Sequence, residues 1–276
     1  MPIITLTTDF GLKDHFAGAV KGAIYSELDN VRIVDISHSV SPFHIIEAAY
    51  IIQNAYKNFP DGTIHIIGID SEQNPENQHI AVKLDSHYFI CANNGIVSLI
   101  TRTILPEEMV EINIHNRVTT NFTVLDVFVQ VASHIARGGT LGVIGKPIKE
   151  IRDITGIMPV VNNDQKQIIG NVIYVDNYGN VVTNITKKLF EDVGKGRDFK
   201  ITARTASFTK IYNRYSDSIN FNIEKSKREE DGKKLAVFNS SGYIELAIYK
   251  SNPSTHGSAA TLFGLDYRDT ITINFE

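Results

Sequence analysis

Residues 63–84, TIHIIGIDSEQNPENQHIAVKL, hold two apolar runs separated by a polar loop. The run at 63–69 predicts a buried strand, and the run at 80–84 predicts a second one. Between them, residues 70–79 carry almost no hydrophobic side chain, and Asp70 stands where the first strand ends. Loops that leave the ends of central strands are where α/β proteins place their chemistry. The polar loop is therefore the first candidate for a functional site.

Around this loop, the first half of the chain alternates strand and helix patterns. The predicted strands are 3–7, 32–36, 63–69, 80–84, 88–92 and 109–112, and the predicted helices are 15–28, 44–59 and 123–137. This alternation predicts an α/β N-terminal domain, residues 1–160, with a largely parallel sheet covered on both faces.

The second half has a different pattern. Short alternating strands are predicted at 167–175, 180–185, 198–203, 234–239, 243–249 and 270–275, with one short helix near 186–192. They predict an all-β, barrel-like C-terminal domain, residues 168–276. Residues 155–167 form the predicted linker, and two domains of unlike class favour a ligand site where they meet.

The composition is that of an ordinary globular protein, with 42% hydrophobic and 21% charged residues among 276. A net charge of −4 gives no general attraction to nucleic acid, and we predict no nucleic-acid partner. No apolar run approaches the ~20 residues that span a bilayer, so no membrane partner is predicted. Cys91 is the single cysteine and the N-terminus shows no secretory signal, which predicts a cytoplasmic protein.

Four polar motifs stand at predicted strand ends. They are TTDFGLKD (7–14) with Asp9 and Asp14, the loop after Asp70, ANNGIVS (92–98) with Asn94, and YVDNYGNVVTNI (174–185) with Asp176 and Asn180. A carboxylate such as Asp9 can accept hydrogen bonds from both hydroxyls of a ribose. Each motif also has a plain structural interpretation, as a turn or a helix cap. No metal-ligand spacing is present, so no metal is predicted. A Gly-x-Gly-x-x-Gly phosphate loop is also missing, which argues against a dinucleotide dehydrogenase.

The order of these motifs is more specific than any one of them. The segments at 7–24, 32–52, 59–70, 93–98, 175–185, 239–249 and 257–264 together resemble the S-adenosylmethionine hydroxide adenosyltransferases, the family that also contains the fluorinase and chlorinase. The resemblance covers nearly the whole chain. It implies an α/β domain followed by a β-barrel, and a homotrimer with ligand sites shared between subunits. It also implies a small-molecule nucleoside ligand, with S-adenosylmethionine as substrate and no cofactor.

The resemblance implies a role for individual residues. Asp9 would hold the ribose hydroxyls, Asp14 the methionine end, Asp176 the methionine ammonium and Asn180 the adenine edge; Asn94 is a further candidate, the backbone around Ser258 and Ala260 would line the adenine pocket, and Tyr212 or Tyr215 would stack on the base. The positive sulfonium and ammonium of the ligand suit a site lined by carboxylates.

The catalytic positions depart from the family pattern. The resemblance implies that hydrolysing members of the family use a set of Asp, Arg and His. Asp70 matches the aspartate of this set. Asn77 occupies the arginine position and Thr123 the histidine position, and these three are the candidate catalytic residues. His79 has two interpretations, as a substitute base or as a surface or strand-flanking histidine.

The sequence favours hydrolysis of S-adenosylmethionine to adenosine and methionine, by in-line attack of water on C5′. Two alternatives remain open. One is a nucleoside-binding pseudoenzyme, because the arginine and histidine are absent. The other is an enzyme with a different nucleophile or ligand. Halogenation is disfavoured, because the sequence leaves no room for the additional loop of the halogenating members and has Val124 in place of a hydroxyl residue.

Overall fold

The N-terminal half of the chain is built on a mostly parallel sheet. In the computed structural model, which describes residues 1–101, 104–114, 120–154, 156–228, 230 and 232–276, this sheet has seven strands in the order β2-β1-β3-β5-β4-β6-β7. The strands are β1 (Ile3–Thr8), β2 (Arg32–Ser37), β3 (Ile64–Gly68), β4 (His79–Leu84), β5 (His87–Ala92), β6 (Glu108–Ile112) and β7 (Gly145–Pro147). Strands β2, β1, β3 and β5 pair in parallel, whereas β4, β6 and β7 add antiparallel ladders. The predicted α/β fold is confirmed.

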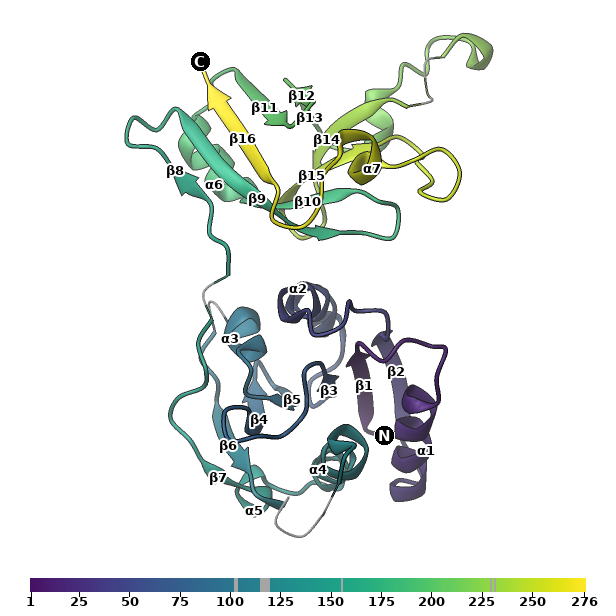
Figure 1. The fold of residues 1–276 in the computed structure, drawn as a ribbon, viewed down its shortest axis with the longest axis vertical. Coiled ribbons are helices and arrows are strands. Elements are labelled where there is room, and N and C mark those ends of the chain that lie inside the picture. The colour runs from purple at the N-terminus through teal and green to yellow at the C-terminus, as the bar shows by residue number, and fades with distance from the viewer. Residues whose placement is uncertain (102–103, 115–119, 155, 229, 231) are drawn as a thin grey trace. The chain divides into compact units, whose positions relative to one another are not determined.

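Helices cover both faces of this sheet (Figure 1). On one face, α1 (Phe16–Glu27) and α4 (Val129–Ala136) pack on strand side chains such as Ile66. On the other face, α2 (Ile45–Ala55) and α3 (Ile96–Thr101) pack on side chains such as Ile67. Successive strand residues point to opposite faces, so neighbouring isoleucines belong to different cores. The short helices η1 (Tyr56–Asn58) and α5 (Leu141–Ile144) also belong to this unit.

The helix predicted at 123–137 begins irregularly. Residues Val124–Phe128 form a π-helical turn, η3, before α4 continues to Ala136. Single π-turns within helices are rare and are frequent at functional sites. Hydrophobic spacing does not predict this turn, which begins directly after Thr123.

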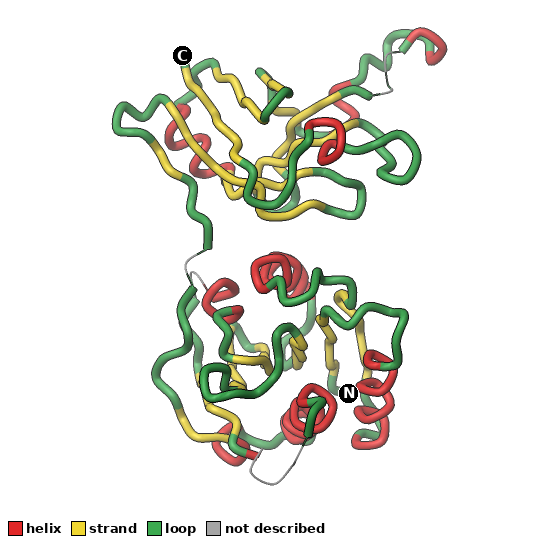
Figure 2. Tube along the Cα trace, in the orientation of Figure 1, coloured by secondary structure: helices red, strands yellow, loops and turns green. Residues whose placement is uncertain are grey.

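The C-terminal half is a second compact unit, Ile157–Glu276, and Met1–Gly156 forms the first. Its strands form a nearly closed, barrel-like sheet in the order β12-β11-β16-β9-β10-β15-β14-β13, with β8 paired to β9. The strands are β8 (Val160–Val161), β9 (Gln167–Val175), β10 (Val181–Thr186), β11 (Phe199–Ala203), β12 (Ala206–Phe208), β13 (Ile211–Tyr212), β14 (Lys234–Phe238), β15 (Tyr243–Ile248) and β16 (Thr270–Phe275). Figure 2 shows short turns between some of these strands, such as β11 and β12, and a longer loop after β15. The predicted barrel-like class is confirmed.

Short helices close this unit around its own apolar core. Helix α6 (Lys187–Gly194) follows β10, as the sequence predicts, and α7 (Ala259–Phe263) was not predicted. The turns η4 (Tyr215–Ser218) and η5 (Lys225–Lys227) lie between β13 and β14. The core includes Ile168, Val181 and Leu246, all buried.

The predicted linker is partly built into the second unit. Strand β8 pairs with β9, and the Asn184 side-chain amide donates to the carbonyl of Ile157 at 2.7 Å. Thr155, the first residue of the predicted linker, lies outside the described residues.

Candidate functional site

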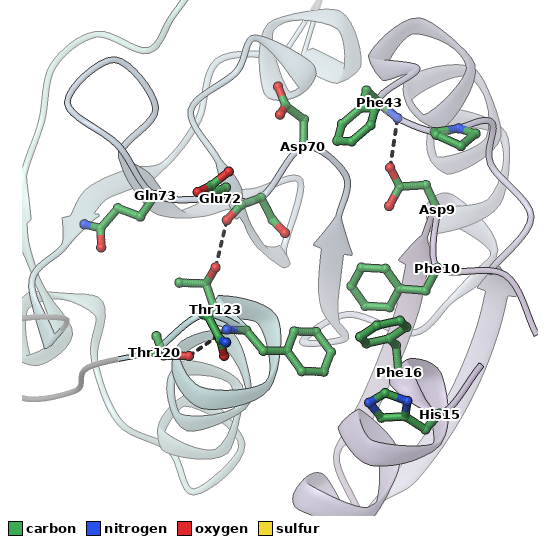
Figure 3. A pocket seen from close by; sticks show the side chains of 14 residues that line it. Asp9, Phe10, His15, Phe16, Phe43, Asp70, Glu72, Gln73, Thr120 and Thr123 are labelled. Carbon is green, nitrogen blue, oxygen red and sulfur yellow. Dashed lines mark hydrogen bonds between the residues drawn. The ribbon is translucent and has the colours of Figure 1, made fainter.

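A cavity of about 950 Å³ opens in the N-terminal unit, beside the ends of β1 and β3 (Figure 3). Its lining consists of Asp9, Phe10, His15, Phe16, Pro42, Phe43, Thr120, Asn121, Phe122, Thr123 and the loop residues Asp70, Ser71, Glu72 and Gln73. Strands β1 and β3 are parallel neighbours, so their carboxyl ends meet at one edge of the sheet. This topology brings Asp9 and Asp70 to the same cavity, as the two motifs predict.

Gly68 allows the two strand ends to approach closely. A Cβ atom at this position would lie 3.1 Å from Phe10 Cζ and 3.1 Å from Val124 Cγ2, and 3.2 Å from Thr8 Cγ2. Such contacts are tighter than ordinary van der Waals packing, so a glycine is favoured at the last residue of β3. The result is that the loop beginning at Asp70 lies directly against the helix that begins near Thr123.

Asp9 is a half-buried carboxylate at the cavity. Its Oδ2 accepts a hydrogen bond from the backbone N–H of Phe43 at 2.9 Å. Burial raises the pKa of Asp9 above its ordinary value of 3.8, and the negative charge of Asp70 raises it further, while the Phe43 N–H acts in the opposite direction. The cavity thus holds two acids close enough to repel each other, which is an arrangement that a cationic ligand would relieve.

Asp70 has an unusual backbone conformation. Its φ is 45°, in the left-handed region that aspartate and asparagine tolerate better than most residues. Any residue other than glycine is strained in this region, and the surrounding contacts must offset that strain. The contacts that hold this loop therefore bear directly on where the Asp70 carboxylate points.

Side chains bond the carbonyls that follow Asp70. The Asn77 amide donates to the carbonyl of Asp70 at 2.8 Å and to that of Glu72 at 3.0 Å. The hydroxyl of Thr123 donates to the carbonyl of Ser71 at 2.9 Å, and His79 Nε2 lies 2.9 Å from the same oxygen. Of the candidate catalytic residues, Asp70 and Thr123 line the cavity, whereas Asn77 is buried behind the loop.

His79 stands at the first position of β4, in agreement with the strand-flanking interpretation, but it is not a surface residue. It is 0% exposed on β4, and its ring meets that of Phe128 edge-on at 4.8 Å. It does not line the cavity, which argues against its role as a substitute base. Strand alternation missed its burial because the loop and the helix cover both sides of this strand end.

Two other predicted residues of the N-terminal unit lie away from the cavity lining. Asn94 is buried, donates to the carbonyl of Ile69 at 3.0 Å and accepts from the N–H of Ile96 at 3.2 Å. Its side chain therefore links the start of α3 to the backbone just after β3, at Ile69, the residue before Asp70. This is a structural role. Asp14 is exposed on the segment before α1.

The sequence missed several residues that line the cavity. Phe10, Phe16 and Phe122 form a cluster with ring centroids 5.4–5.9 Å apart. Phe43, which also lines the cavity, is 71% exposed. Glu72 adds a third carboxylate, and no lysine or arginine is among the described lining residues. The available signal was position alone, because Glu72 follows a predicted strand end and Phe43 immediately precedes a predicted helix start.

In the C-terminal unit, the predicted residues Asp176, Asn180, Ser258 and Ala260 come together. Asp176 Oδ2 accepts from the Asn180 side-chain amide at 3.0 Å, and its Oδ1 accepts from the Asn180 N–H at 2.8 Å. The turn contacts the start of α7, where the N–H of Ala260 donates to the carbonyl of Gly179 at 3.0 Å and Ser258 caps the helix.

The two predicted stacking tyrosines have different environments. The Lys210 ammonium lies 4.7 Å from the ring centroid of Tyr212. The Tyr215 hydroxyl donates to Glu245 Oε1 at 2.6 Å. Burial raises the pKa of Glu245, and the charge of Asp176 raises it further, so Glu245 lies near the 176–180 turn. Glu245 was missed because it stands at an inward position of a strand that otherwise reads as apolar.

Comparison with known families settles what kind of protein this is. Residues 4–145 match the SAM hydroxide adenosyltransferase N-terminal domain, and residues 170–272 match the C-terminal domain of the same family. The chain belongs to the SAM hydroxide adenosyltransferase family. The resemblance noted in the sequence is thereby confirmed.

Individual relatives agree with this family. The chain is 28% identical, over 99% of its length and 96% of the relative's, to the (R)-S-adenosyl-L-methionine hydrolase of Methanocaldococcus jannaschii. It is 22% identical to the fluorinase of Actinopolyspora mzabensis, over 89% of this chain and 90% of that one. The crystal structure of an uncharacterized conserved protein from Thermotoga maritima superposes with a TM-score of 0.81 at 25% identity, covering 99% of this chain and 100% of that chain.

Within the described residues, no group of three or more His, Cys, Asp or Glu side chains is arranged to hold a metal ion. None of the described helices combines the length and the apolar character needed to cross a membrane.

Proposed function

We propose that this protein hydrolyses S-adenosylmethionine to adenosine and methionine at the cavity beside β1 and β3. The observation that carries the proposal is that Asp9 and Asp70 face one cavity in a chain of this family whose full-length relative is named an S-adenosylmethionine hydrolase. The same relationship favours a hydrolase over the nucleoside-binding pseudoenzyme.

The reaction is a displacement at C5′ of the ribose. The oxygen of water forms a bond to C5′ while the C5′–sulfur bond breaks. The electron pair of the breaking bond stays on the sulfur, which leaves as neutral methionine. The attacking water loses a proton, which Asp70 accepts and releases to solvent. Asp9 accepts hydrogen bonds from the two ribose hydroxyls. The acidic lining complements the sulfonium and ammonium charges of the substrate.

The acidic lining also separates hydrolysis from halogenation. Asp9, Asp70 and Glu72 surround a cavity whose described lining residues include no lysine or arginine. A halide ion entering such a cavity would be repelled by the carboxylates of Asp9, Asp70 and Glu72. We therefore assign water, and not a halide, as the nucleophile.

The proposal extends to the C-terminal unit and to assembly. Asp176, Asn180, Tyr212, Ser258 and Ala260 would bind the methionine and adenine ends of the ligand, and Asp14 and Asn94 would support the N-terminal side. The family resemblance implies a homotrimer, in which these groups would lie at contacts between subunits. Sedimentation velocity should therefore show a trimer, and a monomer at micromolar concentration would contradict this extension.

Turnover is the direct test of the function. Purified protein incubated with S-adenosylmethionine should release adenosine and methionine in equal amounts, followed by chromatography. Addition of chloride or fluoride should yield no 5′-halogenated nucleoside. Tight binding of S-adenosylmethionine without any adenosine would contradict the proposal and would identify a binding protein instead.

The pH dependence of adenosine binding follows from the raised pKa of Asp9. The ionised carboxylate of Asp9 accepts hydrogen bonds from both ribose hydroxyls. The affinity for adenosine should therefore fall as pH drops through this pKa. Because burial and Asp70 raise the pKa, the midpoint should lie above 3.8. In Asp70→Asn, the neighbouring charge is gone and the midpoint should shift to lower pH. Calorimetric titration across pH measures both midpoints, with circular dichroism as the control for folding; a wild-type midpoint at or below 3.8 would contradict the assignment.

A further inference from the structure

The loop after β3 depends on side chains to satisfy its backbone. Residues Asp70, Ser71 and Glu72 lie at the cavity, and the carbonyl oxygen of each accepts a hydrogen bond from a side chain elsewhere in the fold. Further along, Asn74 and Asn77 pair through their backbones, which closes the loop into a small turn. The part of the loop that faces the cavity is therefore held from behind.

Asn77 spans the loop with one amide group. Its Nδ2 donates to the carbonyls of Asp70 at 2.8 Å and Glu72 at 3.0 Å, which lie on either side of Ser71 in the cavity-facing segment. The reverse orientation of the amide would place Oδ1 against two carbonyl oxygens, which repel it. In the observed orientation Oδ1 is buried without a donor among the described residues, so this side chain works as a donor to the loop.

The carbonyl of Ser71 is held by two further groups. Thr123 Oγ1 donates to it at 2.9 Å and His79 Nε2 lies 2.9 Å away, so Nε2 carries the proton. A carbonyl oxygen has two lone pairs, and these two donors use both. Because the Thr123 hydroxyl hydrogen is committed to Ser71, Thr123 is able only to accept a hydrogen bond from a group in the cavity.

We propose that Asn77, His79 and Thr123 are positioning residues for the hydrolysis, holding the carbonyls of residues 70–72 so that the Asp70 carboxylate is aimed into the cavity. The need for such a clamp is visible at Asp70, whose φ of 45° is a strained conformation that neighbouring contacts must maintain. The inference rests on the proposed function and assigns a purpose to two sites where the family resemblance expects charged or titratable groups. Asn77 and Thr123 there stabilise the loop and do not exchange protons.

The first test removes one hydrogen bond of the clamp with little change in shape. Thr123→Val should lower kcat by roughly 10- to 100-fold, as expected when a reacting group is displaced slightly. The dissociation constant of adenosine should stay close to the wild-type value, because Asp9 is untouched. Thr123→Ser keeps the hydroxyl and should restore kcat. Thr202→Val, on β11 of the other unit, is the matched control for the substitution itself.

A double-mutant cycle separates positioning from direct catalysis. If Thr123 acts through Asp70, then Thr123→Val should cost little further activity in an Asp70→Asn background. If the loss of kcat in the double variant equals the product of the two single losses, the inference is overturned. Thr123 would then act on the substrate independently of Asp70.

Amide hydrogen exchange tests the clamp without any turnover. The amides of residues 70–78 should exchange faster in Thr123→Val than in wild type or Thr123→Ser, while the core strands stay protected. Unchanged exchange in this loop would overturn the inference. The two failures are distinguishable: wild-type protein that does not release adenosine contradicts the proposed function, whereas the exchange rates report on the clamp in either case.

Discussion

Asp70→Asn is expected to lower kcat by roughly 10²–10⁴-fold, the range that a positioned general base contributes. The asparagine has nearly the same shape and tolerates the left-handed conformation at this position, so the loop should keep its structure. It cannot accept a proton from water. Steady-state release of adenosine measures the loss.

The same variant separates catalysis from binding. Asp70→Asn should still bind adenosine, because the neutral nucleoside does not depend on the charge of this carboxylate. A variant that keeps wild-type kcat would remove Asp70 from the reaction. Asp70→Ala is the less informative substitution, because alanine also disfavours a φ of 45° and would confound chemistry with strain.

Asp9→Asn is expected to act on affinity. Hydrogen bonds to a charged group contribute about 1.5–3 kcal/mol, which corresponds to roughly 10- to 150-fold in the dissociation constant of adenosine. The asparagine oxygen can still accept from the Phe43 N–H, so the local turn should persist. Calorimetric titration with adenosine measures the effect.

An exposed acid of the same unit provides the comparison. Asp29→Asn removes one negative charge far from the cavity lining and should leave affinity unchanged. Equal affinities of Asp9→Asn and wild type would show that the ribose is held elsewhere.

Much of the fold follows from local patterns that tertiary structure does not override. Apolar alternation predicted β9 at its observed limits, Gln167–Val175. The second helix was predicted at 44–59, up to the Pro-Asp-Gly turn at 60–62; α2 ends earlier, at Ala55, and the short helix η1 continues to Asn58. Asp9 and Asp70 could be placed at one edge because both end parallel strands. The site could be predicted to this extent because strand ends are fixed by topology.

The rest of the site depends on contacts between distant segments. Thr123 bonds the carbonyl of Ser71 across 52 positions of sequence, and Asn77 binds backbone carbonyls that no side-chain pattern marks. His79 is buried because a loop and a helix meet over it, and not because of its place in a strand. The family resemblance predicts charged or titratable groups at the positions of Asn77 and Thr123, whereas only the geometry shows what these two side chains hold.

The most direct test of the account is the fate of the water oxygen. Wild-type protein should be incubated with S-adenosylmethionine in water enriched in a heavy oxygen isotope, and the products should be examined by mass spectrometry. Attack of water on C5′ predicts the heavy isotope in the 5′-hydroxyl of adenosine and none in methionine. Adenosine without the label, or cleavage that leaves the sulfur on the nucleoside, would contradict the proposed reaction.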